Sequence, residues 1–163
     1  MKALLIYDSR YGNTEKIAHA IGDGLAEGLA ASGSVRVLPI GEAHAGQLAD
    51  WDLLIAGAPT HGSHPSPAMR EFLDGVPDKA LTGVKVAAFD TRTDMDTLNG
   101  AQRWFGKFLD RLGYAAPKIS ASLQAKGGQV VRQPEGFIVK GTEGPLEEGE
   151  LERATGWGRQ IAA

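Results

Sequence analysis

The stretch from Lys2 to Leu29 constrains the fold of this chain more than any other, because it indicates a strand, a tight loop and a helix in direct succession. Residues 2–7 form a short apolar run typical of a strand buried on both faces, and residues 8–12 are rich in turn formers. The segment that follows has one apolar face, with a spacing of four between Ile17, Ile21, Leu25 and Leu29. A buried strand followed by an amphipathic helix is typical of a parallel sheet covered by helices.

The loop between this strand and this helix carries groups that can bind a phosphate. The hydroxyls of Ser9 and Thr14, the Asn13 amide and unpaired backbone N–H groups converge at the positive end of the helix dipole. Gly12 lets the backbone approach a ligand closely, and Asn13 or Gly12 can cap the helix, with Glu15 in its first turn. Taken alone, the loop could also be an ordinary polar connection.

Length and composition indicate a single globular domain spanning residues 1–163. Apolar residues make up 42% of the chain and charged residues 23%, and no Gly/Ser tract or charge block interrupts it. There is no cysteine, which excludes a disulfide framework, a thiol nucleophile and a cysteine-ligated iron–sulfur cluster.

Charge and the N-terminal segment set expectations about partners and location. The net charge is -3, from 17 basic and 20 acidic side chains, without a basic stripe interleaved with aromatics, so nucleic acid is not an expected partner. The first apolar run, about six residues long, is too short for a signal peptide or a membrane span. We therefore expect a cytoplasmic protein without a membrane span.

The rest of the chain continues the alternation of strands and helices. We expect strands at residues 35–40, 51–58 and 82–89, and a fifth strand that begins at 119–123, is interrupted by an excursion and resumes at 137–139. Helices are expected at about 68–75 and 99–113, and a last helix contains Leu151, Ala154, Trp157 and Ile161. The sequence therefore predicts an α/β fold, with a three-layer, doubly wound, five-stranded parallel sheet.

In such sheets ligands bind outside the carboxyl ends of the strands, at the switch point between the first and third strands. Three polar loops follow the strands at this edge, at residues 8–14, 59–64 and 90–94. We expect them to form one binding site.

Two of these loops carry motifs of a known family. Residues 9–14, S-R-Y-G-N-T, resemble the phosphate loop of the flavodoxins, T/S-x-T-G-N-T, with Tyr11 in place of a threonine but still carrying a hydroxyl. Residues 59–62 are similar to the family's P-T-x-G turn, and residues 143–146 with the last helix look like one subgroup of flavodoxin-like proteins. The resemblance covers nearly the whole chain and implies the strand order 2-1-3-4-5.

The resemblance also implies a cofactor, a function and a set of site residues. It implies FMN, held by a protein that carries electrons between redox partner proteins, a reductase and an acceptor. The residues that would hold FMN are Ser9, Arg10, Tyr11, Gly12, Asn13, Thr14, Pro59, Thr60, His61, Gly62, Asp90, Thr91, Arg92 and Thr93. In flavodoxins a peptide in the second loop turns on reduction to bond the flavin N5, a role that Gly62 would fill.

Three features depart from the flavodoxin pattern. The chain is less acidic than typical members, which weakens the negative face that flavodoxins offer to partners. His61 stands where the family places an aromatic in the second loop, and residues 90–95 contain no aromatic, so the flavin ring should be more exposed or less tightly held. We further hypothesise that Arg92, as a cation near the pyrimidine side, favours the anionic reduced flavin and raises its potential.

Other functions remain open at this point. A flavin-dependent NAD(P)H or quinone oxidoreductase on the same fold would use the space left by the missing aromatics. A receiver-type regulator needs a carboxylate at the end of the third strand, where this chain has Ala58 and Pro59. His61 and His64 lie in an irregular segment without an evident third ligand, so no metal site is expected. The glycines at 22, 24 and 28 fall inside the first helix and indicate packing, not a dinucleotide fingerprint.

Overall fold

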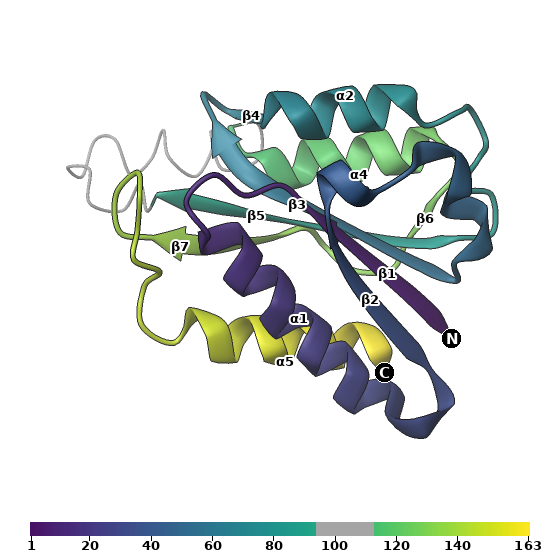
Figure 1. Ribbon diagram of the computed structural model, residues 1–163, viewed down its shortest axis with the longest axis horizontal. Helices are drawn as coiled ribbons and strands as arrows, with labels where there is room; N and C mark the ends of the chain where they lie inside the picture. The colour runs from purple at the N-terminus through teal and green to yellow at the C-terminus, as the bar shows by residue number, and fades with distance from the viewer. Residues whose placement is uncertain (94–112) are drawn as a thin grey trace.

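The computed structural model, which describes residues 1–93 and 113–163, is built around a twisted parallel sheet (Figure 1). Its main strands follow the order β2-β1-β3-β5-β6, β7 also pairs with β5, and the short β4 pairs antiparallel with β3. The strands are β1 (Lys2–Tyr7), β2 (Ser34–Pro39), β3 (Leu53–His61), β4 (His64–Pro65), β5 (Lys85–Thr93), β6 (Gln129–Val130) and β7 (Glu135–Val139). The predicted order of five parallel positions is confirmed, and β6 and β7 share the fifth position beside β5.

Helices cover both faces of the sheet and complete three layers (Figure 1). One face carries α1 (Asn13–Leu29) and α5 (Glu150–Ala162), and the other carries α2 (Pro67–Gly75) and α4 (Ala115–Ala125). Short 3-10 turns are η1 (Ala30–Ser32), η2 (Ile40–Glu42) and η3 (Ala45–Asp50). Each interface has its own buried apolar cluster, because strand side chains alternate between the two faces.

Two sequence predictions are corrected by the structure. Residues 119–123 do not begin the fifth strand but belong to α4, whose buried positions include Ala115, Ile119 and Leu123 at a helical spacing of four. Residues 59–61 and 90–93 are not loops, because β3 extends through His61 and β5 through Thr93. The helix expected over 99–113 lies outside the described residues except for its last position.

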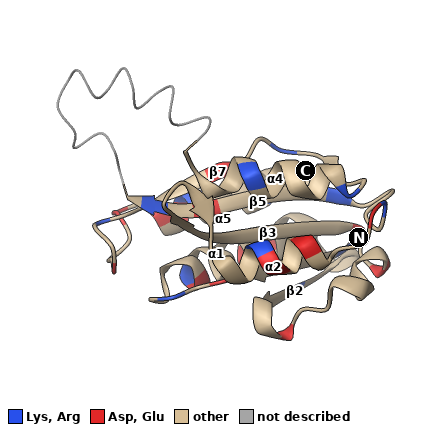
Figure 2. Ribbon diagram, turned by 90° about the horizontal axis from the view of Figure 1, so that it is seen from above, with Lys and Arg blue, Asp and Glu red and all other residues tan. Residues whose placement is uncertain are grey.

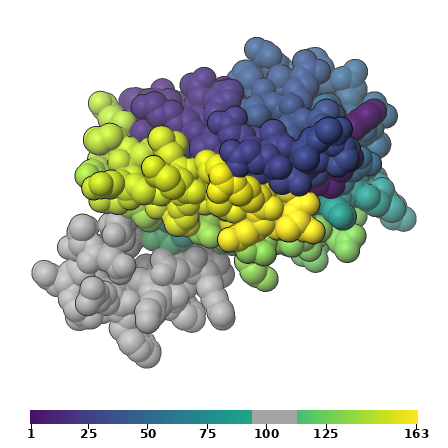
Figure 3. Space-filling view, turned by 90° about the horizontal axis from the view of Figure 1, so that it is seen from below, coloured from purple at the N-terminus to yellow at the C-terminus, as the bar shows by residue number. Residues whose placement is uncertain are grey.

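The glycines of the first helix allow close packing of α1 against α5, which lie side by side over the lower face (Figure 3). A Cβ on Gly24 would overlap the Thr155 carbonyl oxygen, one on Gly28 would overlap the Ala162 side chain, and one on Gly158 would overlap the Ile21 carbonyl oxygen. On the sheet side, a Cβ on Gly22 would come within 2.7 Å of Val37. The prediction that these α1 glycines serve packing is confirmed.

Side chains of α5 form hydrogen bonds with backbone groups of β7. The Glu150 carboxylate accepts a hydrogen bond from the Ile138 N–H at 2.6 Å, and Arg153 donates to the Gly136 carbonyl oxygen. Arg153 also pairs with Glu150 at 2.7 Å. Burial alone would raise the pKa of Glu150, but the hydrogen bonds from Arg153 and Ile138 outweigh it and hold this pKa below its ordinary value.

Within the described ranges no helix has the length and apolar character needed to cross a membrane. Lysine, arginine, aspartate and glutamate are interspersed over the layers of the molecule (Figure 2). The surface that is described therefore has the mixed charge expected from the composition.

Gly158 and Gly156 offer a matched test of the helix contact, because both lie in α5 and only Gly158 faces α1. We expect Gly158→Ala to lower the free energy of unfolding by about 1–3 kcal/mol, the usual cost of overpacking. Gly156 has no atom near its Cβ position, so Gly156→Ala should be neutral or stabilise by up to about 1 kcal/mol. Urea unfolding followed by circular dichroism measures both, and equal effects would contradict the close contact.

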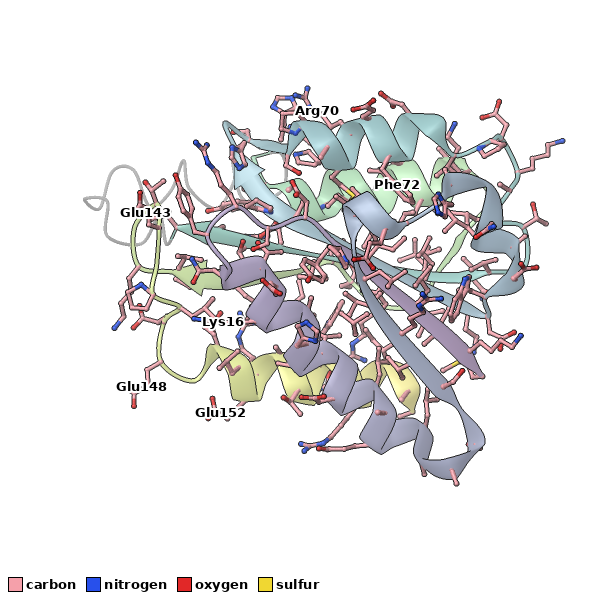
Figure 4. All side chains as sticks on the ribbon, viewed as in Figure 1. Lys16, Arg70, Phe72, Glu143, Glu148 and Glu152 are labelled. Atoms are coloured by element: carbon pink, nitrogen blue, oxygen red, sulfur yellow. The ribbon has the colours of Figure 1, made fainter. Side chains whose placement is uncertain are left out.

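The lowered pKa of Glu150 predicts a pH-dependent contribution to stability. An unfolded glutamate titrates near pH ~4.3, so the contribution is complete above that pH and is lost as the pH falls through the lower folded pKa. The difference in unfolding free energy between the parent and Glu150→Gln should therefore shrink as the pH falls from about 5 to 3. Glu148→Gln, at an exposed side chain (Figure 4), should show no such trend in the same urea series.

Candidate functional site

The carboxyl ends of β1, β3, β5 and β7 surround a cavity of about 310 Å³. This volume lies at the lower end of the range for small-molecule pockets. The cavity is lined by Ser9, Arg10, Tyr11, Asn13, Thr14, Pro59, Thr60, His61, Gly62, Thr91, Arg92, Thr93, Val139, Gly141 and Thr142. The described lining contains two arginines and no aspartate or glutamate, which suits an anionic ligand.

In the described part of the chain no side chain caps the start of α1. Gly12 is the N-cap residue, with a φ of 88° that favours glycine, and its own N–H donates to the Ser9 hydroxyl at 3.1 Å. The N–H groups of the first turn have no intrahelical acceptor, since no turn precedes them. The positive end of α1 therefore faces the cavity with backbone donors available for a ligand.

Two buried hydroxyls join the first loop to β5. Thr14 and Thr91 lie 2.8 Å apart, and either can be the donor. Because the pair shares one hydrogen between its two oxygens, the second hydroxyl hydrogen can be donated to another group. Both residues line the cavity, so this hydrogen is within reach of a ligand there.

The Asn13 amide binds the loop that follows β7. Its Nδ2 donates to the Glu143 carbonyl oxygen at 2.9 Å, and a Cβ on Gly144 would come within 2.8 Å of the same amide. Thr93 donates to the Gly141 carbonyl oxygen at 3.4 Å. Glu143 lies at the end of the molecule where α1 begins (Figure 4). Asn13 thus holds the loop that follows β7, called the fourth loop below, against the first loop.

The second loop is a tight hairpin between β3 and β4. Its central residues, Gly62 and Ser63, have φ values of 50° and 69°, the positive pair that a two-residue hairpin requires. His64 Nδ1 lies 2.9 Å from the Gly62 carbonyl oxygen, and Lys118 binds the Ser63 carbonyl oxygen. His61 is exposed and lines the cavity. Across residues 1–93 and 113–163 no group of three or more His, Cys, Asp or Glu side chains could hold a metal ion.

Strand-end side chains cap α4. The Asp90 carboxylate is fully buried and accepts the Ala116 N–H at 2.7 Å, while the Thr60 hydroxyl accepts the Ala115 N–H at 3.0 Å. Asp90 also receives two hydrogen bonds from Arg92, at 2.6 and 2.8 Å. Burial raises the pKa of Asp90 above its ordinary value, while Arg92 and the Ala116 N–H act in the opposite direction.

Arg92 has a fixed position in the cavity wall. Its guanidinium lies over the Tyr114 ring, 3.6 Å from the ring centroid, and its side chain is only 17% exposed. A Cβ on Gly136 would overlap the same guanidinium, so a glycine at this position of β7 leaves room for it. Tyr114 is buried beneath this guanidinium and does not belong to the cavity lining.

Twelve of the fourteen predicted site residues line the cavity, and the exceptions are Gly12 and Asp90. Gly12 supports the first loop through its backbone conformation. Asp90 is buried outside the cavity lining and binds Arg92, which belongs to that lining. Sequence reasoning missed Val139, Gly141 and Thr142. A signal was present, because the turn formers after residues 137–139 follow a parallel strand and must lie at the same sheet edge.

Comparison with known proteins shows the family of this chain. The flavodoxin family model matches residues 5–157. A curated relative, probable flavodoxin 2 of Bacillus subtilis (strain 168), is 34% identical over 164 aligned residues, which cover 99% of this chain and 94% of that protein.

Solved structures of flavodoxins superpose along the whole chain. The crystal structure of oxidised flavodoxin 1 from Bacillus cereus has a TM-score of 0.75 and 25% identity, covering 99% of this chain and 97% of the other. A flavodoxin from the domain Archaea has the same TM-score at 22% identity, covering 99% and 96%, and supports the fold alone. The family match over most of the chain shows that this protein belongs to the flavodoxins, FMN-binding electron-transfer proteins that act with redox partner proteins.

Proposed function

We propose that this chain holds the FMN phosphate at the start of α1 and its flavin ring between the β3–β4 hairpin and residues 91–93. The observation that carries this placement is the uncapped first turn of α1, which opens into the cavity. Backbone N–H groups at a helix N-terminus bind phosphate well because the dipole adds to their hydrogen bonds. Arg10 in the same wall adds a positive charge.

Side chains around the phosphate position have distinct proposed roles. The Thr14–Thr91 pair donates its second hydroxyl hydrogen to a phosphate oxygen. Asn13 is engaged with Glu143, so it positions the fourth loop and contributes to the phosphate site chiefly through its backbone N–H. Gly141 and Thr142 then border the bound cofactor from the side of β7.

We propose that the protein works as a single-domain electron carrier in the cytoplasm. The described cavity wall offers the ring Pro59, His61 and Gly62 from the hairpin and no stacked aromatic from this loop, which leaves a ring edge open to a partner protein. The protein supplies the binding site and its electrostatic environment, and FMN supplies the redox chemistry. Its donor and acceptor are expected to be other redox proteins.

If the phosphate site is placed correctly, FMN should bind far more tightly than riboflavin, which has the same ring but no phosphate. Two or more charge-assisted hydrogen bonds of about 1.5–3 kcal/mol each predict an affinity ratio of about 100-fold or more. The visible spectrum of the purified protein, before and after addition of each flavin and desalting, shows binding, and quenching of flavin fluorescence gives the Kd. Inorganic phosphate should compete with FMN and leave riboflavin binding unchanged.

A colourless protein after incubation with FMN and desalting would contradict the proposal. Equal affinities for FMN and riboflavin would contradict the phosphate site alone. Steady oxidation of NAD(P)H with a quinone, in the absence of an added reductase, would show an oxidoreductase instead of a carrier.

The fourth loop should contribute to FMN affinity through Asn13. Gly144→Ala places a Cβ against the Asn13 amide, so we expect loss of the Asn13–Glu143 bond and about tenfold weaker FMN binding, or about 1.4 kcal/mol. Gly149→Ala is the control, because Gly149 has a similar positive φ of 84° with open space around it. Both substitutions place an alanine at a positive φ, 104° at residue 144 and 84° at residue 149. Equal Kd values in fluorescence titrations would show that the loop contact does not support the site.

A further inference from the structure

The pairing of Arg92 with Asp90 uses only part of the guanidinium. Nε and Nη2 bind the two carboxylate oxygens, and Nη1 makes no hydrogen bond with any described residue. Tyr114 and Gly136 fix the plane of the group. Because Arg92 lines the cavity, the remaining N–H edge is the part that a ring in the cavity can meet.

We propose that Asp90 is a positioning residue that holds Arg92 beside the flavin ring and compensates the guanidinium charge there, which keeps the flavin's potential below the value that an uncompensated Arg92 would give. This inference rests on the proposed function, since it requires FMN in the cavity. It differs from the expectation that Arg92 acts as an isolated cation, because the structure places a buried carboxylate in bidentate contact with it.

The physical reason is the sum of the two charges that the ring experiences. A lone guanidinium in a partly buried wall favours extra electrons on the flavin, because little water screens the attraction. The negative charge of the Asp90 carboxylate offsets that attraction. The main remaining interaction between Arg92 and the ring is then the directional N–H hydrogen bond. Without Asp90, the positive charge would be uncompensated, and reduced FMN would gain affinity relative to oxidised FMN.

The same contact also fixes where the donor lies. Asp90 is itself held by the Ala116 N–H at the start of α4, so the carboxylate, and with it the guanidinium, is tied to a rigid helix. This second contact makes a purely structural role for Asp90 the competing explanation. The two roles are separated by the flavin potential, which a stability change alone would not move in a fixed direction.

The test uses Asp90→Asn, Arg92→Gln and the double variant, each loaded with FMN. Asparagine has nearly the size of aspartate, glutamine is shorter than arginine but keeps an N–H donor, and each substitution removes one charge. Glu27→Gln is the charge control, since it also frees an arginine, Arg159, from its carboxylate. Glu27 lies fourteen residues beyond Asn13 in α1, about 21 Å along the helix from the phosphate position.

We expect Asp90→Asn to raise the ratio of affinities for reduced over oxidised FMN about tenfold, a rise of about 30 mV for the two-electron couple. The double variant, neutral at both positions, should return to within about twofold of the parent ratio. Glu27→Gln should leave it unchanged. The potential is read by spectroelectrochemical titration, with folding of each variant checked by circular dichroism.

Several outcomes would overturn this inference. An unchanged potential in Asp90→Asn, or a double variant displaced as far as Asp90→Asn, would show that the two charges do not compensate at the flavin. If Asp90→Asn does not fold, the double variant decides, since a potential far from the parent contradicts compensation. Failure of the parent to bind FMN contradicts the proposed function instead, before the potential is measured.

Discussion

The uncapped start of α1 is the constraint on which the site depends. Backbone donors at a helix start must find acceptors, and here no side chain within residues 1–93 or 113–163 supplies one. The Ser9 hydroxyl could have capped the helix, but it accepts the N–H of Gly12, the residue before α1. The positive φ of Gly12 then turns the chain into the helix. The loop is therefore shaped to leave the first turn open to a ligand.

Helix α4 begins at the same sheet edge, but side chains accept the N–H groups of its first turn. The first turn of α4 is satisfied by the Thr60 hydroxyl and the Asp90 carboxylate, which belong to β3 and β5. Both helices begin near the carboxyl ends of the strands, as the doubly wound topology requires. Of these two helix starts, only that of α1 keeps its donors free of described side chains, which supports the proposal that α1, and not α4, binds the phosphate.

The alternating strands and helices and the place of the first loop were predicted well because they depend on local signals, whereas the strand order came from the resemblance to flavodoxins. Residues 2–29 combine an apolar run, turn formers and a helical period that agree with one another. Residues 119–123 were misjudged because Ile119 and Leu123 fit either period, while Pro117 in the first turn and the surrounding alanines favoured a helix. The contact between Asn13 and Glu143 spans 130 residues, so no local pattern could reveal it.

The extension of β5 through Thr93 places side chains of one short segment at both halves of the proposed cofactor site. In a strand, alternate side chains point to opposite faces, so Asp90 and Arg92 turn toward α4 while Thr91 turns toward α1. Thr91 thereby reaches the side of the cavity proposed for the phosphate, and Arg92 reaches the side proposed for the ring. A loop with the same residues would not keep Thr91 and Arg92 on opposite faces. The pairing of β5 with β3 and β7 holds this alternation of side chains in place.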